Sequence, residues 1–174
     1  MRTNEQKVKV AFDRQAPVFD SLYANDEIIC YKRQRVREHV LKHIKKKSSI
    51  LELNAGTGDD ALFFARQGHS VYATDLSPEM FCIRQEKVKQ SGLEHVITNE
   101  ICSYTELHNL HNKGPFDLIF SNFAGLNCTN KLPSVLKDLI PLVKPGGLIT
   151  LVLLPPFCLW ETLLFFKGKW KTAS

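Results

Sequence analysis

The stretch ILELNAGTGDDALFFA, residues 50–65, changes character in its middle. An apolar run at 50–53 is followed by the glycine-containing segment 54–58, and helical spacing of apolar side chains resumes at 59–65. Glycine has no Cβ, so it adopts unusual backbone angles and lets a ligand approach the main chain. The stretch predicts a strand, a tight loop and a helix whose N–H groups face a cofactor, the alternative being a turn that needs glycine only for its geometry.

The rest of the chain also alternates between apolar strands and amphipathic helices. After two N-terminal helical segments, the patterns predict strands at 49–53, 70–74, 96–102, 116–121 and 147–154, with helices at 59–67, 77–91 and 132–142. Apolar strands alternating with helices are typical of a parallel sheet covered on both faces. We therefore predict a doubly wound, mostly parallel Rossmann-like α/β fold, with residues 1–47 as a helical extension or lid and 48–174 as the ligand-binding domain.

Asp75 ends the second predicted strand. It follows the glycine loop at about the 20-residue spacing at which an acid receives ribose hydroxyls in nucleotide-binding folds. A carboxylate can accept two hydrogen bonds from a vicinal diol. Asp75 could instead be a loop residue ahead of a helix cap at Ser77, but the full series of strand, glycine loop, helix, strand and acid favours a nucleotide-like cofactor.

Composition and charge limit the other classes of function. The net charge of +5 comes largely from residues 31–47, whose apolar side chains share one helix face and whose basic side chains share the other. No aromatic-interleaved groove accompanies this charge, so we expect a solvated face and consider nucleic-acid binding unlikely. His39 and His43 have helical ligand spacing but lack a third ligand, so no metal site is expected.

The cysteines and the ends of the chain bear on localisation. The five cysteines are scattered and never form CxxC, which favours reduced thiols in the cytoplasm. Residues 1–15 lack the apolar core of a signal peptide. The apolar run 148–166 contains Pro155-Pro156 and Glu161, so it predicts a strand followed by a helix and no membrane association.

Taken together, these motifs resemble the class I S-adenosylmethionine-dependent methyltransferases. The first family motif is matched by ELNAGTG at 52–58 and the second by YATDLSPEM at 72–80. The fourth-strand segment is similar to FDLIFSNFAGLN at 116–127, and the turn into strand five to LVKPGGLITLVL at 142–153. AFDRQAPVFDSLY at 11–23 is similar to the opening of the ubiquinone and biotin-pathway type, so the resemblance covers nearly the whole chain.

The resemblance implies a site for S-adenosylmethionine, with S-adenosylhomocysteine as product. It places the loop 54–58 and Glu52 at the amino-acid end, Asp75 on the ribose, and Leu76 and Met80 on the adenine. Asn54 stands where the family often has glycine, and Cys102-Ser103 where it usually has an acid. The candidate cofactor-binding residues are Glu52, Asn54, Ala55, Gly56, Gly58, Asp75, Leu76, Met80, Cys102, Ser103, Asn122, Phe123 and Tyr23.

The implied activity is methyl transfer to a small-molecule acceptor. In-line displacement depends mainly on alignment, so no catalytic residue is singled out, although His108, His111 and Tyr104 lie in a connection that could approach the site. Two alternatives stay open: a regulatory subunit that binds S-adenosylmethionine without turnover, and an NAD(P)-binding oxidoreductase, because residues 56–61 also satisfy GxGxxG/A.

The C-terminal segment departs from the family pattern. Family members usually add a helix and a β-hairpin after strand five, whereas only PPFCLWETLLFFKGKWKTAS follows here. We expect that these strands are missing through truncation and that the exposed sheet edge favours a homo-dimer.

Overall fold

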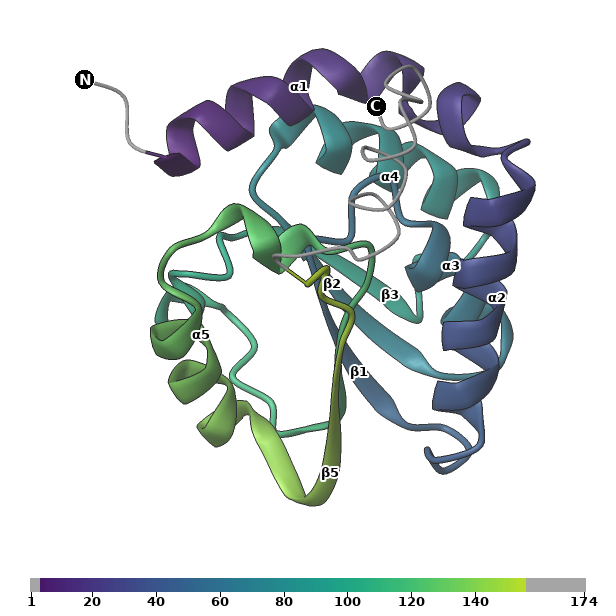
Figure 1. The fold of residues 1–174 in the computed structure, drawn as a ribbon. Helices are drawn as coiled ribbons and strands as arrows, with labels where there is room; N and C mark the ends of the chain where they lie inside the picture. The colour runs from purple at the N-terminus through teal and green to yellow at the C-terminus, as the bar shows by residue number, and fades with distance from the viewer. Residues whose placement is uncertain (1–3, 156–174) are drawn as a thin grey trace, which may run out of the picture.

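The computed structural model describes residues 4–155. Within this range one sheet has the strand order β3-β2-β1-β4-β5, and every neighbouring pair is parallel (Figure 1). The strands are β1 (Ser49–Leu53), β2 (Ser70–Asp75), β3 (Ile97–Ile101), β4 (Phe116–Ser121) and β5 (Val143–Leu151). The predicted doubly wound α/β fold is confirmed.

Helices precede, separate and flank the strands. They are α1 (Asn4–Tyr23), α2 (Glu27–Leu41), α3 (Asp59–Arg66), α4 (Pro78–Gln90) and α5 (Leu132–Leu139), with 3₁₀ turns η1 (Leu107–Asn109), η2 (Gly125–Cys128) and η3 (Ile140–Leu142). The expected cap of α4 is present: the Ser77 hydroxyl accepts a hydrogen bond from the Met80 N–H at 3.1 Å. Pro78 follows in the first turn, where its missing N–H leaves no hydrogen bond unmade.

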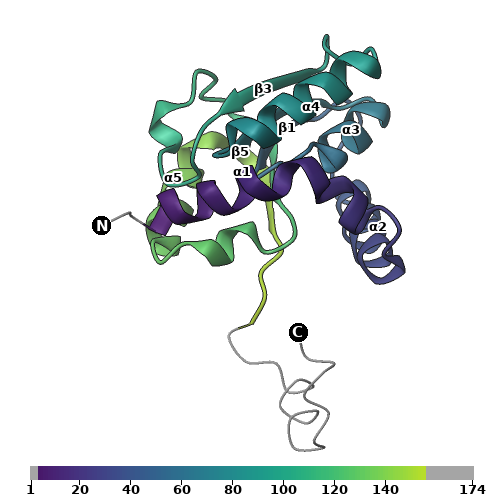
Figure 2. The ribbon, with the colours of Figure 1, turned by 90° about the horizontal axis from the view of Figure 1, so that it is seen from above.

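Alternating side chains of the strands enter two separate cores. Ile50 and Phe120 pack with α2, α3 and α4 on one face of the sheet. Leu51 and Ile119 pack with α5 and the turns η1 to η3 on the other face (Figure 2). Both faces of the central strands β1 and β4 are covered, so nearly all of their residues are buried, and ligands have access mainly at the ends of the strands.

The largest differences from the predicted boundaries are at β5, which also ends at Leu151 and not at residue 154, and at α5; the other elements differ by at most one residue at an end. β5 begins at Val143 and not at Gly147, because Val143 pairs with Phe116 ahead of a register irregularity. The helix predicted at 132–142 ends at Leu139 and continues as η3, whose Pro141 has no N–H to extend an α-helix. The helix and basic tail expected after residue 155 lie outside the described residues.

Helix α1 crosses the molecule above the carboxyl ends of the strands (Figures 1 and 2). It packs against α4, and hydroxyl groups that follow β1, β2 and β3 bind its carboxylates. The N-terminal extension therefore covers the edge of the sheet where a ligand is expected. Across residues 4–155, none of the helices has the length and apolar character that crossing a membrane requires.

Candidate functional site

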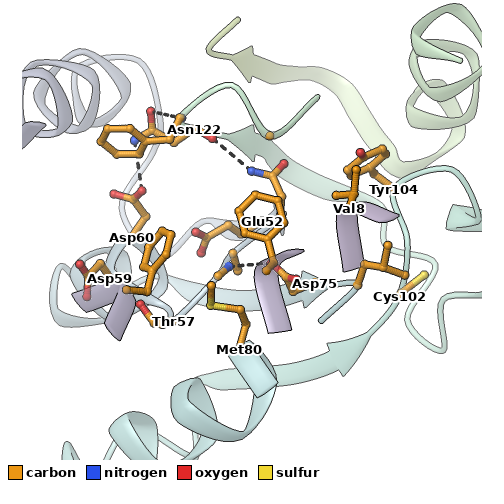
Figure 3. A pocket seen from close by; sticks show the side chains of 18 of the residues that line it. Val8, Glu52, Thr57, Asp59, Asp60, Asp75, Met80, Cys102, Tyr104 and Asn122 are labelled. Carbon is orange, nitrogen blue, oxygen red and sulfur yellow. Dashed lines mark hydrogen bonds between the residues drawn. The ribbon is translucent and has the colours of Figure 1, made fainter. Parts of the chain in front are cut away.

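A pocket lies between α1 and the carboxyl ends of the strands. Its space, counted with its opening to solvent, is about 880 Å³. Helices α1 and α2 contribute Val8, Phe12, Phe19 and Arg33. The ends of the strands, the segments that follow them and the starts of α3 and α4 contribute Glu52, Asn54, Ala55, Gly56, Thr57, Asp59, Asp60, Asp75, Leu76, Met80, Cys102, Tyr104, Asn122, Phe123 and Gly125. Figure 3 shows carboxylates of this pocket gathered around Glu52.

Asn54 joins the glycine loop to the end of β4. Its backbone is left-handed, with φ at 46°, a conformation that asparagine tolerates better than most residues. Its side chain accepts a hydrogen bond from the Ser121 hydroxyl at 2.7 Å and donates one to the Asn122 carbonyl at 3.1 Å. A Cβ at Gly125 would lie 2.3 Å from the Asn54 amide nitrogen, so glycine is required there.

Asp75 binds the same loop from β2. One carboxylate oxygen accepts the Gly56 N–H at 2.8 Å and the other accepts the Ser77 N–H at 2.9 Å. Each carboxylate oxygen has a further lone pair for a ligand hydroxyl. Asp75 is half-buried and lines the pocket, so it is both fixed in place and accessible.

Gly58 has a structural neighbour that the sequence analysis did not anticipate. Its φ is 88°, and a Cβ at this position would lie 2.6 Å from Cγ of Arg84, which comes from α4. Gly58 is buried and does not line the pocket. The need for glycine here follows from the close approach of Arg84, whereas Gly56, with φ at 54° and no atom near its Cβ position, does line the pocket.

Glu52 is the most unusual group of the pocket. It is only 3% exposed, and its Oε2 has no hydrogen-bond partner among the described residues. Burial and the neighbouring Asp60 carboxylate raise the pKa of Glu52 well above its ordinary value, although arginines nearby oppose the shift. A buried carboxyl group without a donor is costly, so this one is placed to accept a hydrogen bond or a positive charge from a ligand.

Helix α2 supplies counter-charges to the first residues of α3. Arg37 binds Asp60 at 2.5 Å, and Arg33 binds Asp59. Burial tends to raise the pKa of Asp59, but the hydrogen bond from Lys87 and the nearby positive charges outweigh it, so this pKa is lowered. Arg33 also lies over the Phe123 ring, 4.6 Å from its centroid, so α2 and the loop after β4 meet at one wall of the pocket.

The opposite end of the pocket is neutral. Figure 3 shows Val8, Cys102 and Tyr104 together on the side of the pocket away from Asp59 and Asp60. The apolar side chains of Leu76 and Met80 also line the pocket. Burial raises the pKa of Cys102 to about 11 and that of Tyr104 to about 12, so both groups stay protonated at neutral pH. This end suits a flat apolar ring system, and the acidic end suits a cationic group.

A family comparison can be set beside this geometry. The family model described as methyltransferase domain matches residues 50–147, which contain the glycine loop, Asp75 and the segment after β4. The chain belongs to this methyltransferase family. The family match favours the methyltransferase interpretation over the NAD(P)-binding alternative.

Relatives of this methyltransferase domain include the demethylmenaquinone methyltransferase of Listeria welshimeri, 26% identical over 149 residues. The alignment covers 83% of this chain and 61% of the relative, so the chain spans less than two thirds of that protein's length. Among solved structures, the cyclase SpnF matches with a TM-score of 0.71 at 18% identity, covering 86% of this chain and 60% of that one. A candidate S-adenosyl-L-methionine-dependent methyltransferase of Methanococcus maripaludis matches with a TM-score of 0.61 at 17% identity, covering 87% and 65%. At these identities the likeness shows the fold.

Most candidate residues of the methyltransferase site lie together in the pocket. Those that line it are Glu52, Asn54, Ala55, Gly56, Asp75, Leu76, Met80, Cys102, Asn122 and Phe123. Gly58, Ser103 and Tyr23 do not line it. The Tyr23 hydroxyl accepts a hydrogen bond from Gln15 at 3.1 Å, whereas Phe19, one turn earlier, does line the pocket.

Sequence reasoning missed several lining residues. Val8, Phe12 and Arg33 come from the N-terminal helices, and no local pattern predicts that these helices turn those side chains toward the loop after β1. Asp59 and Asp60 directly follow Gly58 at the start of α3. This position next to the glycine loop was the signal from which their place in the pocket could have been predicted.

The proposed acid–base candidates separate in the structure. Tyr104 lines the main pocket, but His108 lines a different hollow beside α5. His111 binds Glu100 at 2.7 Å and does not line the pocket. His39 and His43 stack on each other, and residues 4–155 contain no cluster of ligating side chains suited to a metal ion.

Proposed function

We propose that this chain binds S-adenosylmethionine in the pocket and catalyses transfer of its methyl group to a small-molecule acceptor. The observation that supports this most strongly is the buried carboxyl group of Glu52, whose Oε2 has no hydrogen-bond partner within residues 4–155, in a pocket that Asp75 also lines and in a domain of the methyltransferase family. We propose Glu52 for the amino group of the ligand, Asp75 for the ribose hydroxyls, and Leu76 and Met80 for the adenine ring. When bound, S-adenosylmethionine supplies a methyl group on a positively charged sulfur.

The chain's own contribution is binding and alignment. Asn122 is 7% exposed and donates to the Asp60 carboxylate at 3.1 Å, so its orientation is fixed. Phe123 is 40% exposed at the pocket wall, where an aromatic face can attract a cation. Alignment of reacting groups contributes about 7–11 kcal/mol in well-oriented model reactions. No proton transfer is assigned to a particular residue.

The cofactor proposal is tested by calorimetric titration with S-adenosylmethionine, S-adenosylhomocysteine and reduced nicotinamide dinucleotide. We expect saturable binding of the first two, weakened at least about tenfold by Asp75→Ala through loss of hydrogen bonds to a charged group. Asp138→Ala, on α5 and outside the pocket, is the matched control and should bind as the unchanged chain does. Binding of the nicotinamide compound alone would overturn the proposal.

The acceptor is a second part of the proposal. The name of the Listeria relative makes demethylmenaquinone the first acceptor to test, and the aromatic side chains Phe12, Phe19 and Phe123 offer apolar contact. We expect transfer of labelled methyl from S-adenosylmethionine to the quinone, abolished by Asp75→Ala. Cofactor binding without transfer to this or other small acceptors would favour the regulatory-subunit alternative. We also propose that the partner is a small molecule, and not nucleic acid or a membrane. We propose that the protein acts in the cytoplasm.

A further inference from the structure

Arg84 is a fully buried arginine beneath the glycine loop. It is 0% exposed, although it lies on α4 among exposed neighbours such as Gln85 and Glu86, and arginine is almost never fully buried unless it is paired. Its guanidinium donates to the Gly56 carbonyl at 2.6 Å and to the Asn99 side chain at 2.8 Å. Arg84 therefore connects α4, β3 and the loop without lining the pocket itself.

The stem of Arg84 and the loop fit each other closely. A Cβ at Gly58 would lie 2.6 Å from Cγ and 2.9 Å from Cδ of Arg84. The space that a side chain at position 58 would occupy is filled by this stem. The Arg84 guanidinium donates a hydrogen bond to the Gly56 carbonyl, and the Asp75 carboxylate accepts one from the Gly56 N–H. The loop is therefore held at Gly56 by two side chains from different elements.

The charge of Arg84 is also matched to the pocket. Glu52 is buried, and no described residue is a hydrogen-bond partner for its Oε2; the positive charge of Arg84 acts on both Glu52 and Asp75. Other charges that face Glu52 are Asp60 of α3 and Arg33 and Arg37 of α2. Arg33 and Arg37 are bound to Asp59 and Asp60, whereas Arg84 makes its hydrogen bonds to neutral groups. The positive charge of Arg84 is therefore available to interact with the carboxylates of Glu52 and Asp75.

We propose that Arg84 is a positioning residue of the cofactor site, which holds the Gly56 peptide from beneath and supplies the buried positive charge that Glu52 and Asp75 require. This inference rests on the proposed function, because Glu52 and Asp75 are assigned there to the amino group and ribose of the ligand. Arg84 acts through the loop and through charge, without touching the ligand.

The test compares Arg84→Met with Arg84→Lys, titrated with two probes across the neutral pH range. S-adenosylhomocysteine has the amino group that Glu52 would bind, and methylthioadenosine is a related nucleoside without it. For Arg84→Met we expect an affinity loss for S-adenosylhomocysteine of at least about tenfold, the effect of losing interactions with a charged group. The loss for methylthioadenosine should be smaller, since this probe has no amino group for Glu52 to bind and depends only on the loop and on Asp75.

The pH profile separates charge from simple loss of structure. Without the nearby positive charge Glu52 keeps its proton to higher pH, so the fall in S-adenosylhomocysteine affinity on acidification should begin at higher pH in Arg84→Met. Arg84→Lys keeps the charge and should retain the profile of the unchanged chain. The same shift in both variants would overturn the charge role, and unchanged affinity in Arg84→Met would overturn the inference as a whole.

Val88→Ala is the control on the same helix. Val88 lies on α4, is 2% exposed in the hydrophobic core and does not line the pocket. Its truncation should therefore destabilise the fold while leaving the affinity for both probes and its pH profile unchanged. If Val88→Ala reproduced the effects of Arg84→Met, the inference would fail. If Arg84→Met does not fold, Asn99→Ala replaces it, because Asn99 accepts a hydrogen bond from Arg84. We then expect both probes to bind more weakly, with an unchanged pH profile. Unaltered affinity in Asn99→Ala would contradict the inference. Failure of the unchanged chain to bind S-adenosylhomocysteine would instead overturn the proposed function itself, and the inference with it.

Discussion

Single residues of the glycine loop are each held by a partner from another element. Asn54 binds groups at the end of β4, Gly56 binds Asp75 of β2, and Gly58 lies against Arg84 of α4. Asn54 has a left-handed backbone at the position where the family often has glycine, and asparagine adopts this conformation more readily than most residues with a side chain. These contacts hold the main chain in place before a ligand arrives, which lowers the ordering cost of binding.

Glu52 gives a prediction about binding at the residue scale. Its pKa is raised, so in acid it is neutral and offers a cationic amino group little attraction. Affinity of the unchanged chain for S-adenosylhomocysteine should rise as the pH increases through the raised pKa. Glu52→Gln should bind more weakly, by about 1.5–3 kcal/mol at alkaline pH, with a flat profile. Calorimetry over a pH series measures this, and an equally steep profile in Glu52→Gln would contradict the assignment.

The same residue predicts a difference in stability of opposite sign. A carboxyl group whose pKa is higher folded than unfolded opposes folding once the pH exceeds its unfolded value of 4.5. Glu52→Gln should therefore be more stable than the unchanged chain at neutral pH, with the difference shrinking in acid. Urea denaturation at several pH values measures it. A destabilised Glu52→Gln at neutral pH would show that an unseen donor already satisfies this carboxylate.

At the scale of elements, α1 is fastened over the pocket by its own carboxylates. Asp13 accepts a hydrogen bond from the Ser77 hydroxyl at 2.6 Å, and Asp20 accepts one from the Thr57 hydroxyl at 2.6 Å. Glu5 accepts one from the Thr105 hydroxyl. These hydroxyl groups follow β2, β1 and β3, so one helix is connected to the ends of three neighbouring strands.

Removing two of these contacts should loosen α1. The double variant Asp13→Ala, Asp20→Ala loses about 1 kcal/mol per hydrogen bond, so we expect dissociation of S-adenosylhomocysteine to be faster by up to about thirtyfold. Amide hydrogen exchange in residues 5–23 should quicken as well. Stopped-flow and exchange measurements check this, with Asp138→Ala as the control. Unchanged exchange in α1 would show that its apolar contacts alone keep it in place.

A second fastening joins β1, β4 and β5 at their other ends. Asp117 accepts hydrogen bonds from the Ser49 N–H and hydroxyl, both at 2.8 Å, and from the Lys144 ammonium at 2.9 Å. Although burial opposes it, these donors lower the pKa of Asp117 from 3.8 to about 2. The interaction also explains why β5 begins before its proline-glycine turn, at residues that are already tied to β4 and β1.

Asp117 predicts a pH-dependent part of the stability. Because its pKa is lower in the folded chain, its contribution is present above 3.8 and is lost as the pH falls toward about 2. Allowing for solvent screening of this partly exposed group, Asp117→Asn should cost about 1 kcal/mol at neutral pH. The cost should vanish in strong acid. Urea titrations of both chains measure it, with Asp138→Asn as control; a constant difference down to the lowest pH would exclude the ionised interaction.

At the scale of the whole molecule, the pocket is where α1, α2 and the loops after several strands meet. A ligand there binds residues far apart in the chain, from Val8 to Gly125, and so stabilises the folded domain as a unit. Homo-dimer formation, expected from the sequence, stays a prediction.

Product binding should raise the melting temperature. A ligand present at 100 times its dissociation constant stabilises the folded state by about 2.7 kcal/mol, which corresponds to roughly 5–10 °C for a chain of this size. Thermal denaturation with increasing S-adenosylhomocysteine measures the shift. Asp138→Ala should show the full shift and Asp75→Ala a much smaller one. No shift at saturating concentrations would argue against binding in the folded domain.

Periodicity and loop chemistry in the sequence by themselves determined the α/β class, the alternation of strands and helices, the capped start of α4 and the meeting of the glycine loop with Asp75. These features follow from local patterns, because the carboxyl ends of parallel strands necessarily meet at one edge. The family resemblance added most of the other predicted pocket residues. Only the tertiary structure decided that Val8, Phe12 and Arg33 face the pocket, that Gly58 accommodates Arg84, and that β5 begins at Val143. Each of these depends on contacts between residues distant in the chain, such as Arg84 with Gly56 at a separation of 28 residues. No local period specifies which partner a side chain will meet once the sheet is assembled.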